Sequence, residues 1–332
     1  MTSKEITKSV LLARVTRGNL VEKEHSGHIV VVDKDENIIS QVGNNNSPVF
    51  LRSCAKPFQA LPVITSGAFK KFNFSLSELA ICSASHSASQ EHIALVKSIL
   101  NKTGLSEKDL ECGSHNPFDA EMQKYLIKNS LDFCELHNNC SGKHTGMLTV
   151  CLNNNWDIKN YLDFNHPLQQ EILNIIKEYC NINENIQSSL DNCSAPVYGI
   201  PLFKMGAGYL RLFSSDEAAL LKKTFMENPF VIGGKGRLDS SIMNASQDRL
   251  VSKTGADGLC IVTNPKENLS LVVKTMDSDS SIRAIVTLES LKQLGWLNSK
   301  ELDEENIRKL SNRDIKTLKD ISVGKIETTF SL

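Results

Sequence analysis

Segments typical of β-strands lie at the two ends of the chain, and the long stretch between them has the periodicity of helices. Residues 11–43 alternate β-branched runs with turns, which predicts a three-stranded antiparallel meander. The strand pattern returns after Lys253 in GLCIVTN, LSLVVKTM and KIETTF. One antiparallel sheet, built from N- and C-terminal strands and carrying an inserted helical lobe, accounts for this order. The sequence therefore predicts an α+β fold.

The same order predicts a single domain over 1–332. Its sheet region is expected in 1–52 and 253–332, and its mainly helical lobe in 53–252. A chain of 332 residues is long enough to bury a substantial core. Helices are expected over 89–101, over 165–180, twice within 203–226, over 279–294 and, as a charged surface helix, over 301–317.

Charge and cysteine usage limit the classes of partner. A net charge of -1 gives no electrostatic footprint for nucleic acid or an anionic membrane, which favours a small-molecule partner. The first stretch, MTSKEITKSVLLARVTRG, has only a short apolar run, so no signal peptide is expected, and no segment resembles a membrane span. The nine cysteines are scattered, which predicts reduced thiols or metal ligands in a cytoplasmic protein.

The stretch RSCAKPFQ places Ser53 three residues before Lys56 at the predicted start of a helix. Both side chains then fall on one face, where a lysine with a lowered pKa could take the serine proton. This is a nucleophile with its own base, and it is typical of acyl transfer. Pro57 and Pro62 predict a kinked helix, or a short helix that ends in a proline turn.

Two further motifs accompany this pair. Lys253-Thr254-Gly255 precedes a predicted strand, whereas the second K-T-G, at 102–104, ends a helix, where Gly104 suits a C-cap. Between them, CSASHS at 82–87 could supply a middle serine. The order S-x-x-K, serine, K-T-G resembles the serine β-lactamases and penicillin-binding proteins.

A more specific resemblance covers nearly the whole chain. The sequence is similar to the rhizobial-type asparaginases, also called asparaginase II. This resemblance implies a serine β-lactamase-like fold, a homodimer, and a single catalytic domain that hydrolyses L-asparagine to aspartate and ammonia. It also implies two serine–lysine pairs, Ser53 with Lys56 and Ser85 with Lys253. Ser85 could instead cap a helix. The resemblance is carried by VTRGNLVEKEHSGHIVVVD, FLRSCAKPFQALPVI, CSASHSASQEH, CGSHNPF, NNCSGKHTGML, DNCSAPVYGIPL, GGKGRLD and SKTGADG.

The implied pairs suggest a mechanism. Ser53 would attack the side-chain amide carbon while Lys56 takes its proton. Backbone N–H groups of Ser53 and of the strand after Gly255 would hold the oxyanion. Ser85 and Lys253 would relay a proton to the departing ammonia.

A second cluster suggests a metal. Thiolate and imidazole are the usual zinc ligands, so residue types alone predict Cys140, His144 and Cys193. The family resemblance implies Cys140, Lys143 and Cys193 instead. Because serine–lysine chemistry needs no metal, we expect Zn²⁺ to tune substrate binding rather than to activate the nucleophile. Ordinary buried thiols are the alternative.

The charged ends of the substrate need partners, and Arg52, Asp191 and His144 are the candidates. Each of the three could instead belong to a structural ion pair. Three alternatives remain open: a glutaminase, a penicillin-recognising peptidase of the same fold, and a non-catalytic protein that binds zinc or an amino acid.

Overall fold

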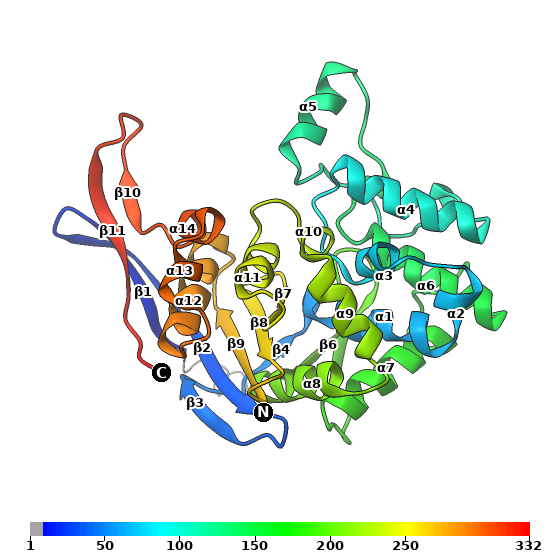
Figure 1. Cartoon of the computed structure of the whole chain (residues 1–332), viewed down its shortest axis with the longest axis horizontal. Coiled ribbons are helices and arrows are strands. Elements are labelled where there is room, and N and C mark those ends of the chain that lie inside the picture. Colours follow the sequence, from blue (N-terminus) through cyan, green and yellow to red (C-terminus); the bar gives the residue numbers. More distant parts are fainter. Residues whose placement is uncertain (1–8) are drawn as a thin grey trace. The chain divides into compact units, whose positions relative to one another are not determined.

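The computed structural model describes residues 9–332, so residues 1–8, within the stretch expected to hold no signal peptide, lie outside it. The chain forms two compact units (Figure 1). The sheet unit comprises the stretch up to Cys54 with Ile200–Leu210 and Ser241–Leu332, and the helical unit comprises Ala55–Gly199 and Arg211–Ser240. Compared with the expected division, the sheet unit also takes in 200–210 and 241–252.

The sheet unit contains an antiparallel sheet with the strand order β10-β11-β1-β2-β9-β8-β7, and β3 also pairs with β2. Strands β1 to β3 form the predicted meander, and β9 joins it by pairing with β2. Segments far apart in the chain therefore share one sheet, which confirms the predicted α+β architecture. The strands of this sheet are β1 Val10–Arg17, β2 Leu20–Asp33, β3 Ile38–Val42, β7 Val251–Thr254, β8 Leu259–Asn264, β9 Leu269–Thr275, β10 Asp314–Lys316 and β11 Ser322–Thr328. The short β4 Pro48–Phe50, before the first helix, is not part of it.

The centre of this sheet is covered on both faces. Ile29, Val30, Val31 and Val32 of β2 are all fully buried, although successive side chains point to opposite faces. Helix α12, Ser280–Gln293, contacts β1, β8 and β9. Helix α8, Leu202–Ser214, approaches the sheet at Gly206, where an added methyl group would lie 2.5 Å from Val32. A two-sided cover explains why the β2 sequence is continuously apolar rather than alternating.

The helical unit is organised around α6, Ser141–Asn154, whose first eleven residues are all buried. Helices α1, α3, α4 and α7 contact it. The predictions for 89–101 and 165–180 are confirmed as α4 and α7, and those for 203–226 and 279–294 as α8, α9 and α12. The remaining elements are α1 Lys56–Thr65, α2 Ala68–Lys71, α3 Leu76–Ser83, α4 Gln90–Thr103, α5 Ala120–Lys128, α7 Pro167–Tyr179, β5 Gln187–Leu190, β6 Pro196–Pro201, α9 Ala219–Glu227, α10 Pro229–Ile232 and α11 Leu238–Ser246, the last of which crosses into the sheet unit.

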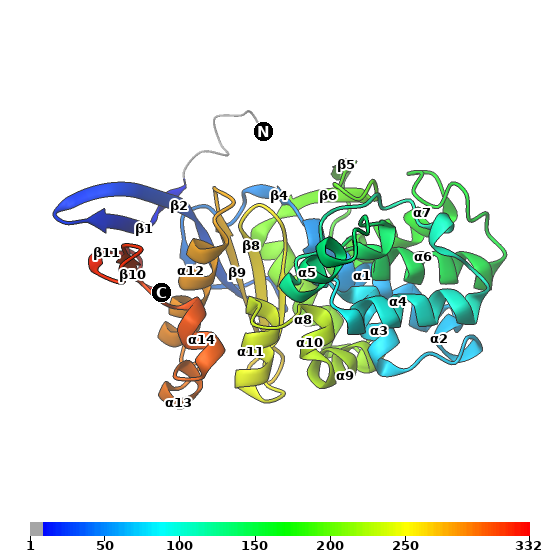
Figure 2. The same cartoon turned by 90° about the horizontal axis from the view of Figure 1, so that it is seen from above.

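The charged surface helix predicted over 301–317 is wrong. Two short helices, α13 Ser299–Leu302 and α14 Glu305–Leu310, are followed by strand β10. Strand β10 pairs with β11 beside β1, as Figure 2 also shows. The pairing partner lies further along the chain, so a local charge pattern could not reveal it.

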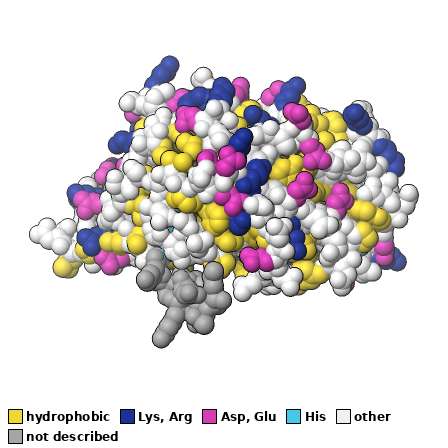
Figure 3. All heavy atoms as spheres, turned by 90° about the horizontal axis from the view of Figure 1, so that it is seen from below, with side chains coloured by type: hydrophobic (Ala, Val, Ile, Leu, Met, Phe, Trp, Pro, Cys, Tyr) yellow, Lys and Arg dark blue, Asp and Glu magenta, His cyan; other side chains and the backbone are white. Residues whose placement is uncertain are grey.

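The surface agrees with the near-zero net charge. On the face drawn in Figure 3, acidic and basic side chains are interspersed among apolar ones. None of the helices within 9–332 combines the length and the apolar character needed to cross a membrane.

Candidate active site

The proposed nucleophile lies in a tight turn rather than in the first turn of an α-helix. Ser53 belongs to the 3₁₀ turn Arg52–Ala55, and Lys56 is the first residue of α1. Pro57 explains the boundary, because it has no N–H to donate to the Ser53 carbonyl but fits the first turn of a helix. Arg52 has φ of 48°, in the left-handed region, so the backbone is strained directly before the serine.

Lys56 and Ser85 are joined by a buried hydrogen bond. Lys56 is 1% exposed, and its Nζ donates to Ser85 Oγ at 2.9 Å. It also donates to the carbonyl oxygens of Ala84 at 2.7 Å and Asn139 at 3.3 Å. Lysine is almost never fully buried without such partners. The contact links Lys56 of one predicted serine–lysine pair with Ser85 of the other.

Ser85 lies in the loop after α3 and does not cap a helix; Ser89 caps α4. The Ser85 backbone N–H donates to the carbonyl of Ile232 at 3.0 Å. Ser87 Oγ donates to the carbonyl of Gly233 at 3.1 Å. The loop is thereby held to the end of α10, which fixes where the Ser85 hydroxyl points.

Lys253 lies within β7, an edge strand of the sheet, whereas the sequence predicted it just before a strand. Its side chain is fully buried, and Nζ donates to the carbonyl of Thr254 at 2.9 Å. The other K-T-G is structural: Gly104 is the left-handed C-cap of α4, and Lys102 pairs with Glu78 at 2.7 Å. The structural role predicted for 102–104 is confirmed, and a catalytic role for Lys253 stays a prediction.

The candidates for substrate recognition have structural partners as well. Arg52 forms an ion pair with Asp257, with Nη1 3.1 Å from Oδ2. Asp191 Oδ1 accepts from the Asn192 backbone N–H at 2.8 Å, and the Asp191 carboxylate acts electrostatically on Lys143. A role for either residue in binding substrate stays a prediction.

The structure brings the proposed zinc ligands together at the N-terminus of α6. Lys143 Nζ donates to Cys193 Sγ at 2.9 Å. A hydrogen bond with Cys140 lowers the pKa of the Cys193 thiol, as does the nearby Lys143 ammonium. Burial favours a lower pKa for Lys143, but the charges of Cys193 and Cys140 outweigh it and raise the pKa. The lowered pKa of Cys193 favours its thiolate form, which is the form that binds metals.

The cluster contains thiol and imidazole groups, the residue types that zinc most often takes as ligands. His144 Nδ1 lies 2.7 Å from Tyr161 Oη, and a side-chain hydrogen bond links His144 with Cys193. Within 9–332 the His, Cys, Asp and Glu side chains form no group of three that could hold a metal, so zinc binding by Cys140, Lys143 and Cys193 stays a prediction. Lys143 would have to lose a proton to coordinate zinc.

Gly142 explains the spacing of the S-G-K-H motif. A methyl group there would overlap the carbonyl oxygen of Ile81 in α3. Only glycine lets α3 and α6 approach so closely, and this contact sets the distance between the loop of Ser85 and the cluster at Cys140.

The chain matches a family of known proteins. Residues 13–328 match the family described as L-asparaginase II. The chain belongs to the L-asparaginase II family. The match covers nearly the whole chain, and it confirms the family predicted from the sequence motifs. No curated protein matches the chain.

Solved structures similar to this L-asparaginase II family member share little sequence with it. A β-lactamase from Mycobacterium bovis has 11% identity and a TM-score of 0.44, covering 82% of this chain and 95% of its own. A putative β-lactamase from Bacteroides dorei has 12% identity and a TM-score of 0.41, with 79% and 92% covered. The octameric penicillin-binding protein homologue from Pyrococcus abyssi has 11% identity and a TM-score of 0.35, with 84% and 75% covered.

Sequence reasoning missed two residues that support the site in this L-asparaginase II family member. Tyr161 contacts His144, but it lies in a loop without any motif. Asn139 offers its carbonyl to Lys56 and is held in turn by His115, whose Nε2 accepts from the Asn139 N–H at 2.9 Å. A backbone acceptor leaves no signature in the sequence, because any residue type can supply it.

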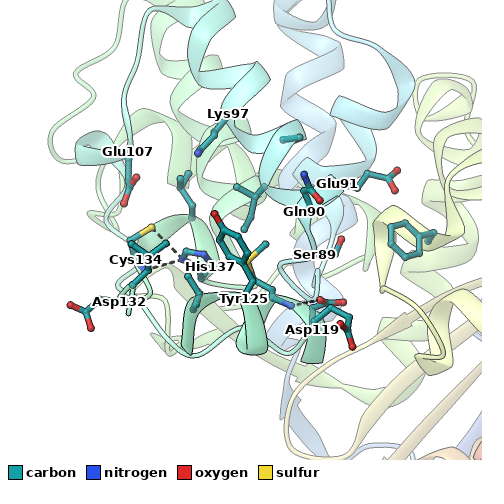
Figure 4. A pocket seen from close by; sticks show the side chains of 18 residues that line it. Ser89, Gln90, Glu91, Lys97, Glu107, Asp119, Tyr125, Asp132, Cys134 and His137 are labelled. Atoms are coloured by element: carbon teal, nitrogen blue, oxygen red, sulfur yellow. Dashed lines mark hydrogen bonds between the residues drawn. The ribbon is translucent and has the colours of Figure 1, made fainter. Parts of the chain in front are cut away.

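A cavity of about 990 Å³ lies elsewhere in the helical unit, between α4 and the α5 segment (Figure 4). Its lining combines apolar residues such as Met122 and Tyr125 with carboxylates including Glu107 and Asp132. None of the predicted site residues lines it.

Two stacked histidines next to the Ser85 loop make stability depend on pH. Burial lowers the pKa of His92 to about 4 and that of His86 well below its usual range. The unfolded chain binds more protons than the native one below about pH 6.5, so the free energy of unfolding is highest above that pH and falls on acidification.

Between pH 6.5 and 5 we expect His92→Gln to reduce the slope of the free energy of unfolding against pH by up to about 1.4 kcal/mol per unit. Urea unfolding measures this, and an unchanged slope would contradict it.

Proposed function

We propose that this chain is an L-asparaginase that hydrolyses L-asparagine to L-aspartate and ammonia through a serine acyl-enzyme. Membership of the L-asparaginase II family supports an asparagine amidohydrolase. The observation that carries the serine mechanism is the buried hydrogen bond between Lys56 and Ser85. Lys56 follows Ser53 by three residues in the chain. A buried lysine in contact with a serine hydroxyl is the arrangement that proton transfer requires.

The proposed reaction has two halves. Ser53 Oγ attacks the side-chain amide carbon, and Lys56 takes the hydroxyl proton. The proton reaches the amide nitrogen through Ser85, with Lys253 assisting, because an amide nitrogen leaves only once it is protonated. The C–N bond breaks, ammonia departs, and a β-aspartyl ester of Ser53 remains. Water then attacks the ester carbon and gives a proton to Lys56. The bond between that carbon and Ser53 Oγ breaks, Lys56 passes the proton to Ser53 Oγ, and aspartate is released.

Charged groups of the chain hold the substrate in this proposal. Arg52 faces the α-carboxylate, and Asp191 the α-ammonium, as charge complementarity requires. Cys140, Lys143 and Cys193 would hold Zn²⁺, which adds a positive charge that tunes substrate binding. His144, kept in position by Tyr161, completes the polar surroundings. The homodimer and the cytoplasmic location stay predictions.

Ammonia release from L-asparagine and L-glutamine by the purified protein tests the function, with the zinc content measured on the same sample. We expect turnover of asparagine, with glutamine slower by about 10- to 200-fold, the discrimination that one extra methylene allows. Faster turnover of glutamine would make the protein a glutaminase. Binding of asparagine to zinc-loaded protein without ammonia release would contradict the enzyme and favour an amino-acid-binding protein.

A further inference from the structure

A chain of hydrogen bonds inside the sheet unit passes through Cys54, the residue after the proposed nucleophile. Tyr209 Oη, on α8, donates to the carbonyl oxygen of Cys54 at 2.6 Å. Cys54 Sγ donates to the carbonyl oxygen of Lys253 at 3.2 Å. Tyr209 and Cys54 are both fully buried. The mechanism above uses neither side chain, yet each contacts the backbone of a residue at or next to the proposed catalytic groups.

The thiol of Cys54 also fills a tight space. The Cys54 N–H donates to the carbonyl of Leu51 at 2.9 Å, which closes the turn around Ser53. A methyl group on Gly255 would lie 3.2 Å from Cys54 Sγ and 3.2 Å from the Leu51 carbonyl oxygen. Arg283 Nη1 donates to the carbonyl of Gly255 at 2.8 Å and so helps to hold the Gly255 backbone in place. The end of β7 therefore packs against the turn that contains Ser53, and the Cys54 sulfur fills the space between them.

We propose that Tyr209 and Cys54 are positioning residues that set the distance between the Ser53 turn and the end of β7. This inference rests on the proposed function. The backbone of the Ser53 turn and the backbone at the end of β7 would supply the N–H groups that stabilise the oxyanion. Such donors work only within about 0.5 Å of the right place. A displacement of about 1 Å costs up to a hundredfold in rate.

Four variants separate positioning from general packing. Tyr209→Phe removes the hydroxyl that fixes the Cys54 carbonyl, and Cys54→Ala removes both the sulfur volume and the donor. Cys54→Ser keeps a donor in nearly the same place and serves as the conservative rescue. Tyr198→Phe is the matched control, because the Tyr198 hydroxyl is equally buried but has no hydrogen-bond partner among the residues described.

Steady-state hydrolysis of L-asparagine by the full chain gives the readout. We expect kcat to fall about 10-fold in Tyr209→Phe and about 10- to 100-fold in Cys54→Ala, with KM changed less than about 2-fold, because the reacting atoms and not the substrate contacts are displaced. Cys54→Ser and Tyr198→Phe should keep kcat within about 3-fold of wild type. Urea unfolding of each variant is measured alongside, to show that the loss of kcat exceeds what reduced folding explains.

Distinct results would overturn the inference. A Tyr209→Phe variant with the kcat of Tyr198→Phe, or a Cys54→Ala variant as active as Cys54→Ser, would remove the positioning role. A rise in KM at unchanged kcat would also contradict it. Failure of the proposed function looks different: wild-type protein without activity, or Ser53→Ala with full activity, would overturn the mechanism and this inference together.

Discussion

Ser53→Ala is expected to release ammonia from L-asparagine at less than about a thousandth of the wild-type rate. The hydroxyl oxygen forms the bond to the amide carbon, and losses of this size or more follow when a serine nucleophile is removed from an amidohydrolase. The change is small in volume and the side chain is only partly buried, so the fold should tolerate it. Initial rates with coupled detection of ammonia measure the effect.

A matched control lies six residues upstream. Ser47 is buried, and its hydroxyl has no hydrogen-bond partner within the described part of the chain, so Ser47→Ala should keep activity within about 2-fold. Acid-quenched wild-type protein should also carry an aspartyl adduct on the peptide that contains Ser53. A Ser53→Ala variant with substantial activity would end the acyl-enzyme mechanism.

Lys56→Met is expected to lower kcat by about 10²- to 10⁴-fold, the range found when a general acid–base is removed. Methionine has a similar length but neither accepts nor donates a proton. The carbonyl oxygens of Ala84 and Asn139 would lose their donor at a cost of about 1–3 kcal/mol each, and removal of a buried charge offsets part of this cost. Activity should therefore fall much more than the free energy of unfolding. Steady-state kinetics and urea unfolding of the same preparation distinguish the two effects.

Lys102→Met provides the comparison for this variant. Lys102 belongs to the second K-T-G and donates both to Glu78 and to the Asn73 carbonyl, so it is also a partnered lysine of the helical unit. Its loss should reduce stability by about 1–3 kcal/mol and leave kcat unchanged. Equal kinetic losses in Lys56→Met and Lys102→Met would show that the effect is structural and would remove Lys56 from the mechanism.

Much of the helical unit could be predicted because its signals are local. In α4, the periodic apolar residues Ile93, Val96, Ile99 and Leu100 are all buried as expected, and Gly104 ends the helix. Side chains three and four residues apart meet on one face of a helix whatever surrounds it, so spacing alone is informative. The meander of β1 to β3 was predictable for the same reason, since its turns join neighbours in the chain.

Prediction was poorer where the partner is distant. Residues 314–316 read as part of a charged helix, yet they pair with β11 as a strand. Residues 200–210 belong with the sheet although their periodicity is helical, because Gly206 packs against Val32 and Val272. Strand pairing and helix-on-sheet packing are decided by surfaces supplied by other segments, and these leave little trace in the local pattern.

The sequence by itself determined the family, and it predicts the chemistry-bearing residues. The order of S-x-x-K, a middle serine and K-T-G predicts Ser53, Lys56, Ser85 and Lys253, because acyl transfer requires those residue types whatever the fold. Only the tertiary structure decided how they are held. In it, Lys56 donates hydrogen bonds to Ser85 and to two backbone carbonyls, and Cys54 donates to the carbonyl of Lys253. Lys143 donates to Cys193, which lies 50 residues further along the chain. The physical reason is that carbonyl acceptors and packed volumes are shared by all residue types, so their use depends on which segments meet.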